Sequence, residues 1–573
     1  MFYYFLFSLI LAVVYFVTSY EKDDEVKTSL IISTLIGIVS FLINYWLMPV
    51  LMPWGFSGIW FWLTLAVFLG ILTRDDIDYK FVIIDYRNIF PAIVVVAFVT
   101  MIISTFPLFH AEKYQKMLTV TTVADSTFKN EISPIPVEKM ISVDADLAKK
   151  IAEDKLGENL GLGSKAEIGD MTIQNITGSF KINGGKTLSF DNDLIWVAPL
   201  EHRSIWKWMA NSYTDGYVIV SATDPTKIYL VTELNGSPLK MKYIESGFFN
   251  DDIERHIKSN GFIAEGLTDH CLEINPNGRP YWVLCTFEKQ IGFSGKNSTG
   301  VITVDPQTGE LQKYGIKNVP NWIDRIHPKD FVEDQIYYWG EYVNGWLNSF
   351  FAQNGVQKPT TGTTLVYSNG CSYWYTGIQS AGADMATNGF MLVNTRTKEA
   401  KFYRIAGMNE KEARRIAMDR PFAKPNGYKV ESPVLYNVKG QPSYFMTYKG
   451  SSGNITGYCF VSVTNRQVFG CGSTKKEAEA EYLRMLKKVA NDKIEDGKVT
   501  QHSKTLVVRD IVNENNVYYI LFEGVKGVEF TGSTEFFKEL KWTHKGDTVS
   551  VSYVEGKETV IALDTFDNLN VEI

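Results

Sequence analysis

The sequence predicts an α-helical membrane segment of about four spans, followed by an α+β repeat body with antiparallel sheets and a small C-terminal all-β, barrel-like domain. Three observations predict this architecture: long uncharged stretches near the N-terminus, a strand pattern that recurs four times, and a change to short strands and tight turns after residue 492. The expected boundaries are 1–110 for the membrane segment, 111–139 for a linker, 140–244, 245–319, 320–408 and 409–492 for four repeat units, the last with a closing helix, and 493–573 for the β domain.

The first 110 residues contain three stretches without a charged side chain, 1–20, 29–72 and 88–109. A helix needs about 20 apolar residues to cross a bilayer core. The middle stretch is about twice that length and has Pro49 and Pro53 near its centre, so it must hold two helices. We expect spans over about 2–19, 29–48, 54–72 and 89–108. A cleaved signal peptide is the alternative for the first, which lacks a basic start and a small-residue cleavage site.

The short loops predict the orientation. Lys22 and Lys27 follow the first span, and Arg74, Lys80 and Arg87 follow the third, whereas the loop after the second span has no basic residue. Basic loops stay on the cytoplasmic side of a membrane. We therefore expect a multi-pass protein of the cell membrane, with both termini and the large C-terminal part outside the cytoplasm.

The repeat pattern consists of a helix, a strand, a polar turn, an aromatic-rich strand and a hairpin opened by glycine. The aromatic strands are 194–197, 280–283, 372–375 and 443–446, and the hairpins open at Gly216, Gly300, Gly389 and Gly457. An apolar run that enters an Asp/Asn/Thr-rich turn and leaves it as a second strand is typical of a β-hairpin. One such unit buries little apolar surface, so successive units should pack on one another.

Helices are predicted at 144–156, 409–418 and 473–489, and a longer one at 328–351, from apolar residues at helical spacing. Asn409 and Ser473 are the expected N-caps of two of them. After residue 492 five strand-like runs replace the helices, which predicts a small barrel or sandwich. These runs are 505–512, 517–522, 527–531, 548–554 and 558–564.

The unit of a helix followed by strands that end in GVITVDPQTGELQKY, from Gly300, resembles the PepSY domain family. Val304 to Glu310 fits the closing motif of that family, a strand, Val-Asp, a Thr-Gly turn and another strand, whereas the other three copies depart from it at the turn. The resemblance covers about residues 140–490. It implies an extracytoplasmic binding or inhibitory module, and it brings no catalytic residues with it.

Five cysteines bear on the compartment. Cys271 and Cys285 flank one turn signal, and Cys459 and Cys471 flank another, so each pair could face across a hairpin and close as a disulfide. The alternative is that they are small buried residues in strands. Cys371 is left over.

Aromatic residues on the four repeated strands, Trp196, Trp282, Trp374 and Phe445, could line a groove for a peptide or glycan. The alternative is that they belong to the cores of strands and helices. A third possibility is membrane contact by 204–209, which holds two tryptophans and requires that stretch to lie close to the bilayer.

No catalytic, cofactor-binding or metal-binding residues are predicted. The seven histidines include no HExxH and no i, i+4 pair. Glu201 to Ser204 and Asp269 to Cys271 place a base beside a nucleophile in sequence only, and 250–254 resembles a capped helix start. The net charge of −7 without a basic stripe argues against a nucleic-acid partner. The expected partners are membrane lipid and a protein or peptide.

These patterns favour a non-enzymatic, membrane-tethered binding or scaffolding protein that engages an envelope protein or peptide outside the cytoplasm. The alternative is an envelope enzyme whose active site is assembled from distant parts of the chain and acts on cell-wall or peptide substrates. A transporter or channel subunit is a third hypothesis, but the predicted spans hold no charged residue of the kind that marks a conduction path.

Overall fold

The structure is a computed structural model of the 573-residue chain. It describes residues 2–20, 26–50, 99–100, 102–123, 128, 131–360, 363–368, 370–382, 386–420, 427–493, 501–514, 517–534, 537–554, 560–563 and 565–571. The chain divides into two compact units. One comprises Met1–Thr119, Ala148–Lys358 and Asn394–Glu399, and the other comprises Val120–Leu147, Pro359–Val393 and Ala400–Ile573.

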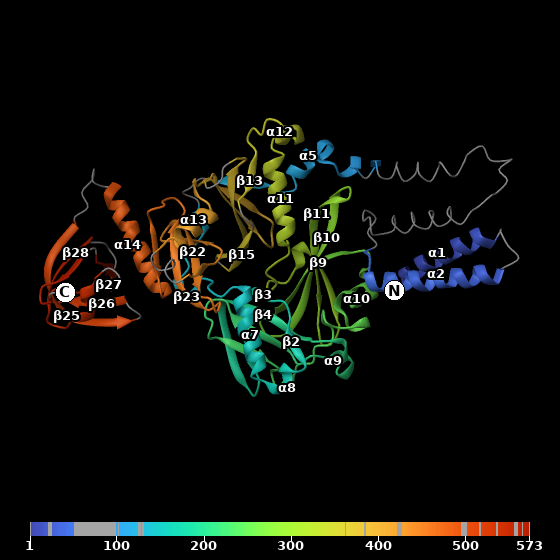
Figure 1. The fold of residues 1–573 in the computed structure, drawn as a ribbon, viewed down its shortest axis with the longest axis horizontal. Coiled ribbons are helices and arrows are strands. Elements are labelled where there is room, and N and C mark those ends of the chain that lie inside the picture. Colours follow the sequence, from blue (N-terminus) through green and yellow to red (C-terminus); the bar gives the residue numbers. More distant parts are fainter. Residues whose placement is uncertain are drawn as a thin grey trace. The chain divides into compact units, whose positions relative to one another are not determined.

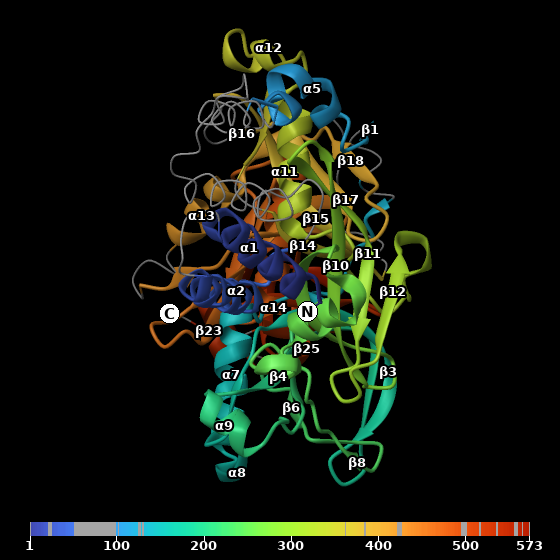
Figure 2. The same ribbon diagram turned by 90° about the vertical axis from the view of Figure 1, so that its right-hand side faces the viewer.

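Two apolar helices, α1 (Phe2–Tyr20) and α2 (Val26–Leu47), lie side by side near the N-terminus (Figures 1 and 2). Polar groups join them: Ser8 Oγ donates to Ser40 Oγ at 3.2 Å, and Asn44 Nδ2 lies 3.4 Å from Ser8 Oγ. Such hydrogen bonds favour helix pairing where lipid offers no polar partner.

The prediction of about four spans is supported in part. Within the described residues one helix, α2, is long and apolar enough to cross a membrane, and it coincides with the predicted span 29–48. The predicted span 2–19 coincides with α1, but the apolar stretch described there, Tyr4–Val13, is too short to qualify. The span 54–72 and most of 89–108 lie outside the described residues.

The first unit contains two antiparallel sheets that share one core. Their strand orders are β6-β5-β4-β3-β7-β8, with β2 on β4, and β12-β11-β10-β9. Ile176 and Tyr217 of the first sheet pack with Trp282 and Ile302 of the second. The strands are β2 (Ala166–Ile168), β3 (Thr172–Ile182), β4 (Lys186–His202), β5 (Tyr217–Ser221), β6 (Ile228–Val231), β7 (Glu233–Leu234), β8 (Ser237–Pro238), β9 (Gly266–Ile274), β10 (Pro280–Ile291), β11 (Ser294–Val304) and β12 (Leu311–Gly315).

The second unit also packs two sheets around one core. β18, β17 and β15 form one sheet, with β14 on β15, and β20-β22-β23-β24 with β21 form the other. Tyr375 and Phe390 of the first sheet pack with Tyr444 and Val461 of the second. The strands are β14 (Thr364–Ser368), β15 (Cys371–Ser380), β16 (Ala386–Thr387), β17 (Gly389–Asn394), β18 (Ala400–Tyr403), β19 (Gly407–Met408), β20 (Lys429–Val430), β21 (Val434–Val438), β22 (Gln441–Lys449), β23 (Ile455–Ser462) and β24 (Phe469–Gly472), and the chain also has β13 (Gln357–Pro359).

The same four-stranded meander therefore occurs four times in the described part, in the strand sets β3 to β6, β9 to β12, β14-β15-β17-β18 and β21 to β24. The aromatic strand is the second of each set. A helix precedes each meander: α7 (Ala145–Gly157), α10 (Ile253–Ile257), α11 (Lys329–Glu341) and α13 (Glu410–Met418). This order of helix and strands agrees with the prediction from the sequence. The structure adds that the meanders pair and share cores.

Of the residues predicted as a linker, 111–139, those from 120 onward belong to the second unit. β1 (Val120–Val123) pairs in parallel with β18, and Phe128 is fully buried against Phe390 and Tyr403. This segment is polar with a few isolated apolar residues, so it has no helical or strand period from which its role could be predicted.

The prediction of a single helix over 328–351 is wrong. The structure has α11 and α12 (Trp346–Phe350), separated at Gly345, whose φ of +83° is incompatible with a right-handed helix. Asn409 caps α13 as predicted, with its side chain accepting from Glu412 N. In α14 (Lys475–Lys493) the cap is Thr474 rather than Ser473, and Glu477 reaches back to Ser473.

Six strands form the C-terminal sheet, in the order β29-β27-β26-β25-β28-β30. The long strand β25 pairs with β28 along its first half and with β26 along its second, so the sheet wraps around one core as a half-barrel. β29 and β30 stand at the two ends of the described order. The strands are β25 (Gln501–Glu514), β26 (Val517–Phe522), β27 (Glu529–Ser533), β28 (Thr548–Val554), β29 (Val560–Ala562) and β30 (Thr565–Asn568).

Candidate ligand-binding pocket

A cavity of about 170 Å³ opens on the second sheet of the first unit, at the ends of β10, β11 and β12. This volume suits one side chain or a similarly small group rather than a drug-sized ligand. Its lining combines aromatic rings with carboxylates and amides. The lining residues are Asn275, Tyr281, Thr303, Asp305, Glu310, Gln312, Tyr314 and Trp322.

The acidic side of the pocket follows from the turn between β11 and β12. Asp305 Oδ1 accepts from Gln307 N at 2.8 Å and from Thr308 N at 3.1 Å, which fixes the turn. The other carboxylate oxygen of Asp305 accepts from Arg279 Nε at 2.6 Å. Glu310, at the end of the turn, is exposed, so the pocket has one paired and one solvent-facing carboxylate.

The aromatic side is formed by Tyr281 and Trp322, whose ring centroids are 5.4 Å apart and whose planes are inclined by 37°. Tyr281 comes from β10, and Trp322 from the connection after β12, which packs on the sheet through Ile323 and Ile326. Partial burial, together with the negative charges of Asp305 and Glu310, raises the pKa of Tyr281 although Arg279 opposes the shift. The pocket is therefore an anionic site with π faces.

Such a site can stabilise a small cation. The faces of aromatic rings attract ammonium and guanidinium groups, and a carboxylate beside the rings can accept a charge-assisted hydrogen bond from the same cation. Asp305 and Glu310 each carry a negative charge, and Arg279 carries the positive charge that pairs with Asp305. The formal charge of this group is therefore −1.

A larger open cavity, of about 720 Å³, lies beside α7, α8 (Leu160–Gly163) and the edge strand β6. The Asn183 side chain bonds the backbone of the edge strand β6 and of the residues that follow it. Its Nδ2 donates to Leu230 O at 2.5 Å, and its Oδ1 accepts from the amides of Thr232 and Glu233 at 3.0 Å each. Backbone groups that are already bonded are poor acceptors of an added strand. This cavity is the weaker candidate.

The predicted aromatic groove is not formed. Trp282, Trp374 and Phe445 are 3%, 5% and 1% exposed, so these rings belong to sheet cores, and Trp196 is half-buried on β4. Trp282 also donates from Nε1 to Tyr243 O at 2.9 Å. The period of a strand places alternate residues on opposite faces, and Trp282 faces the core while its neighbour Tyr281 faces the pocket.

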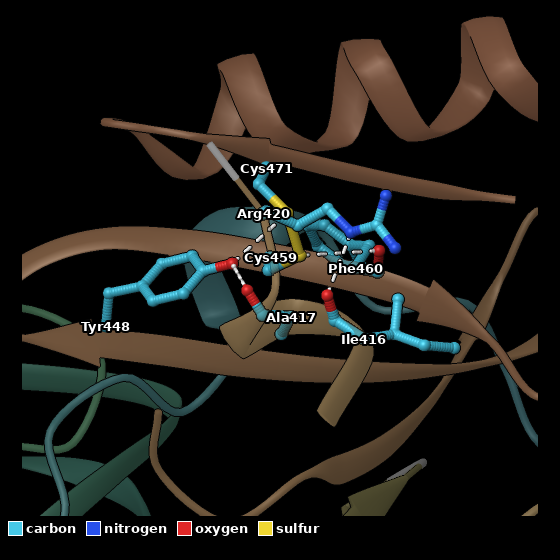
Figure 3. Close-up of a disulfide and its surroundings, with 7 residues drawn as sticks. All are labelled: Ile416, Ala417, Arg420, Tyr448, Cys459, Phe460 and Cys471. Carbon is cyan, nitrogen blue, oxygen red and sulfur yellow. Dashed lines mark hydrogen bonds between the residues drawn. A yellow bond between two sulfur atoms is a disulfide. The ribbon is translucent and has the colours of Figure 1, made fainter. Parts of the chain in front are cut away.

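Cys459 and Cys471 lie directly opposite each other on β23 and β24, with Cα atoms 4.0 Å apart, and their sulfur atoms are bonded (Figure 3). The Tyr448 hydroxyl donates to Ala417 O at 2.9 Å and lies 3.3 Å from Cys471 Sγ. The disulfide thus closes a hairpin that α13 covers.

Cys271 and Cys285 form no such bond. Cys271 is opposite Val283, and Cys285 is opposite Thr268 across a register shift, so the two thiols are offset along the strands. Both are buried, and burial raises the pKa of each thiol well above its usual value. Arg325 donates to Cys271 Sγ at 3.0 Å. These are inert core thiols beside a buried polar group rather than a bridge.

The described residues contain no group of three or more His, Cys, Asp or Glu side chains that could hold a metal ion. Asp252, in the acidic run 250–254, caps α10 by accepting from Arg255 N, as the sequence predicted.

Glu201, Glu245 and His270 form a small group of titratable side chains. Burial, together with the charge of Glu245, raises the pKa of Glu201 to about 7. Glu245 in turn lies 3.2 Å from His270.

The sequence matches no protein-family model, and no curated protein matches it. The resemblance to PepSY domains, drawn from Val304 to Glu310, therefore stays a prediction. That same motif supplies Asp305 and Glu310 of the pocket, whereas Trp322 carried no sequence signal because it lies outside any regular element.

Proposed function

We propose that the chain is a membrane-anchored binding or scaffolding protein that displays its repeat body outside the cytoplasm and engages an envelope protein or peptide. The apolar helix α2 supports the anchor. The disulfide between Cys459 and Cys471 supports an oxidising compartment for the body. The four-span arrangement and the PepSY likeness belong to this proposal.

The observation that carries the binding function is the anionic aromatic pocket. Tyr281 and Trp322 offer two ring faces, and Glu310 offers an exposed carboxylate beside them. We infer that this pocket accepts a lysine or arginine side chain of the partner.

The binding test uses the full chain in detergent micelles and peptides that differ at one central residue, Lys, Arg, norleucine or Glu. Lys and Arg peptides should be retained and the other two should not. Glu310→Gln and Trp322→Ala should each weaken retention, whereas Glu288→Gln, an exposed carboxylate elsewhere on β10, should leave it unchanged. Equal binding of the Lys and norleucine peptides would reject the cationic ligand, and retention of a neutral sugar instead would assign the pocket to glycans.

The compartment is tested separately through Cys371, the one exposed cysteine among the described residues. A membrane-impermeant thiol reagent added to intact cells that express the full chain should label it, and Cys371→Ser should abolish the label. Labelling only after the cells are opened would place the body in the cytoplasm.

The enzyme hypothesis has one observation in its favour. Glu201 is buried, its pKa is raised to about 7, and its charged neighbour Glu245 lies 3.2 Å from His270, a combination that recurs in active sites. Neither cavity described above is lined by these residues. Hydrolysis of a peptide or cell-wall substrate that Glu201→Gln abolishes would favour the enzyme over the binding protein.

A further inference from the structure

The short helix α9 (Ile205–Ala210) exposes an unusual set of apolar side chains. Trp206 is 72% exposed, Met209 62% and Ile205 37%, and these three positions lie on one helical face. Phe249, on the neighbouring turn, is 55% exposed. A cluster of large exposed apolar residues on a monomer usually marks a contact surface.

Trp208, which is half-buried, fixes α9 to the start of α10. Its ring centroid lies 5.5 Å from that of Phe248 and 5.7 Å from that of Phe249, and its Nε1 donates to Asp251 Oδ2 at 3.1 Å. Asp252, the next residue, caps α10. The exposed face of α9 is therefore held in place relative to α10.

The C-terminal end of the apolar helix α2 contacts α10. The Arg255 guanidinium lies over the rings of Tyr45 and Trp46, at 4.7 and 5.8 Å from their centroids. Lys258 Nζ donates to Met48 O at 2.5 Å. Figure 1 shows α9 and α10 at the same end of their unit as this helix end. Tyr and Trp at a helix end are typical of the membrane–water interface.

We propose that Ile205, Trp206, Met209 and Phe249 form a bilayer-contact surface that enters the interfacial layer of the leaflet in which α2 ends. The inference rests on the proposed membrane anchor. Lipid is the expected partner because the surface is continuous, through α10, with the end of α2. The surface also combines Trp, Met and Phe side chains with the exposed cations Arg203 and Lys207. This composition suits a segment that lies in the interface plane.

The experiment places an environment-sensitive fluorophore at single cysteines of the full chain reconstituted into lipid vesicles, with Cys371→Ser as background. The labelled variants are Met209→Cys, Phe249→Cys, Trp46→Cys at the end of α2, and Asn277→Cys on an exposed turn. Lipids that carry a nitroxide at the headgroup should quench positions 209 and 249 as strongly as position 46, and should leave 277 unquenched.

The outcomes separate the two proposals. Loss of emission at 46 without loss at 209 and 249 would overturn the bilayer contact while leaving the anchor intact. No quenching at 46 would overturn the anchor itself. Protection of 209 and 249 from both the lipid quencher and an aqueous quencher would show that protein covers the surface, which also overturns the inference. Trp206→Ser with Met209→Ser should reduce quenching at 249 without changing the circular dichroism spectrum, because neither side chain is buried.

Discussion

Gly300 on β11 lies so close to Tyr314 on β12 that a Cβ atom added to the glycine would come within 2.0 Å of the tyrosine carbonyl oxygen. Gly216 stands in the same relation to Val231 O, at 2.0 Å, and Gly389 to Tyr403 O, at 2.1 Å. Three of the four repeated hairpins thus open with a glycine for one steric reason, the close approach of the next strand.

Gly300→Ala should therefore destabilise the first unit by about 2 kcal/mol or more, since the clash is with backbone that cannot move without breaking the sheet. Gly315→Ala is the matched control, because it lies opposite Gly300 on β12 and an added Cβ there meets nothing within 4 Å. Urea unfolding of the full chain in detergent, followed by tryptophan fluorescence, would measure both. Equal midpoints for the two variants would contradict the steric role of the glycine.

The order of strands within each repeat could be predicted from the sequence because it depends on local signals, such as the period of apolar residues and the turn chemistry at Asp305 and Asn394. The pairing of repeats into shared cores could not, because it depends on contacts between residues such as Tyr217 and Gly278 that lie far apart in sequence. Register had the same limit: the turn sets Ile274 opposite Pro280, and this register places Cys271 opposite Val283, two residues short of Cys285.

The pocket shows the same division. Asp305 and Glu310 were visible as a turn motif, and Tyr281 as part of an aromatic strand. Only the fold brings Trp322 beside Tyr281, and only the strand geometry decides that Tyr281, and not Trp282, faces the cavity.

The disulfide makes a prediction about stability. Replacing Cys459 and Cys471 together by alanine should destabilise the second unit by about 2–3 kcal/mol, because the bond closes a short loop and limits the unfolded chain. The thermal unfolding midpoint should fall, and reduction of the unchanged protein should lower it by a similar amount. Cys371→Ser should have no effect, since that thiol is exposed and unbridged. A midpoint that is insensitive to both changes would mean that the thiols are not bonded in the folded protein.

Arg396 makes the turn Asn394–Glu399 part of the first unit. Its guanidinium donates to the carbonyl oxygens of Val319, Pro320 and Ile323, which form the connection after β12. Lysine keeps the positive charge but lacks the planar guanidinium, so it cannot make the same hydrogen bonds. Arg396→Lys should therefore lower the free energy of unfolding by about 1–3 kcal/mol and loosen this connection.

Limited trypsin digestion with mass spectrometry would detect the loosening as faster cleavage after Lys317 and Arg325. Arg509→Lys, on the exposed side of β25, is the control and should leave these cleavage rates unchanged. Unaltered cleavage in Arg396→Lys would show that the three hydrogen bonds do not hold the connection.

Glu201 should make the stability of the first unit depend on pH. Burial, reinforced by the charge of Glu245, raises the pKa of Glu201 from 4.5 to about 7 in the folded chain, and Oε1 makes no hydrogen bond with any described residue. Below pH 4.5 the carboxyl is protonated in both states. Between pH 4.5 and 7 the folded chain keeps a proton that the unfolded chain has lost, so the free energy of unfolding falls as the pH rises through this window.

Glu201→Gln removes that titration, so the variant should gain stability relative to the unchanged protein as the pH rises from about 4.5 to 7. The gain should be on the order of 3 kcal/mol, at about 1.4 kcal/mol for each pKa unit. Urea unfolding at pH 5, 6, 7 and 8 would follow the difference. It should grow up to pH 7 and then level off. A constant difference for Glu201→Gln would mean that this carboxyl is ionised in the folded protein throughout the range, with water or a cation at the buried oxygen.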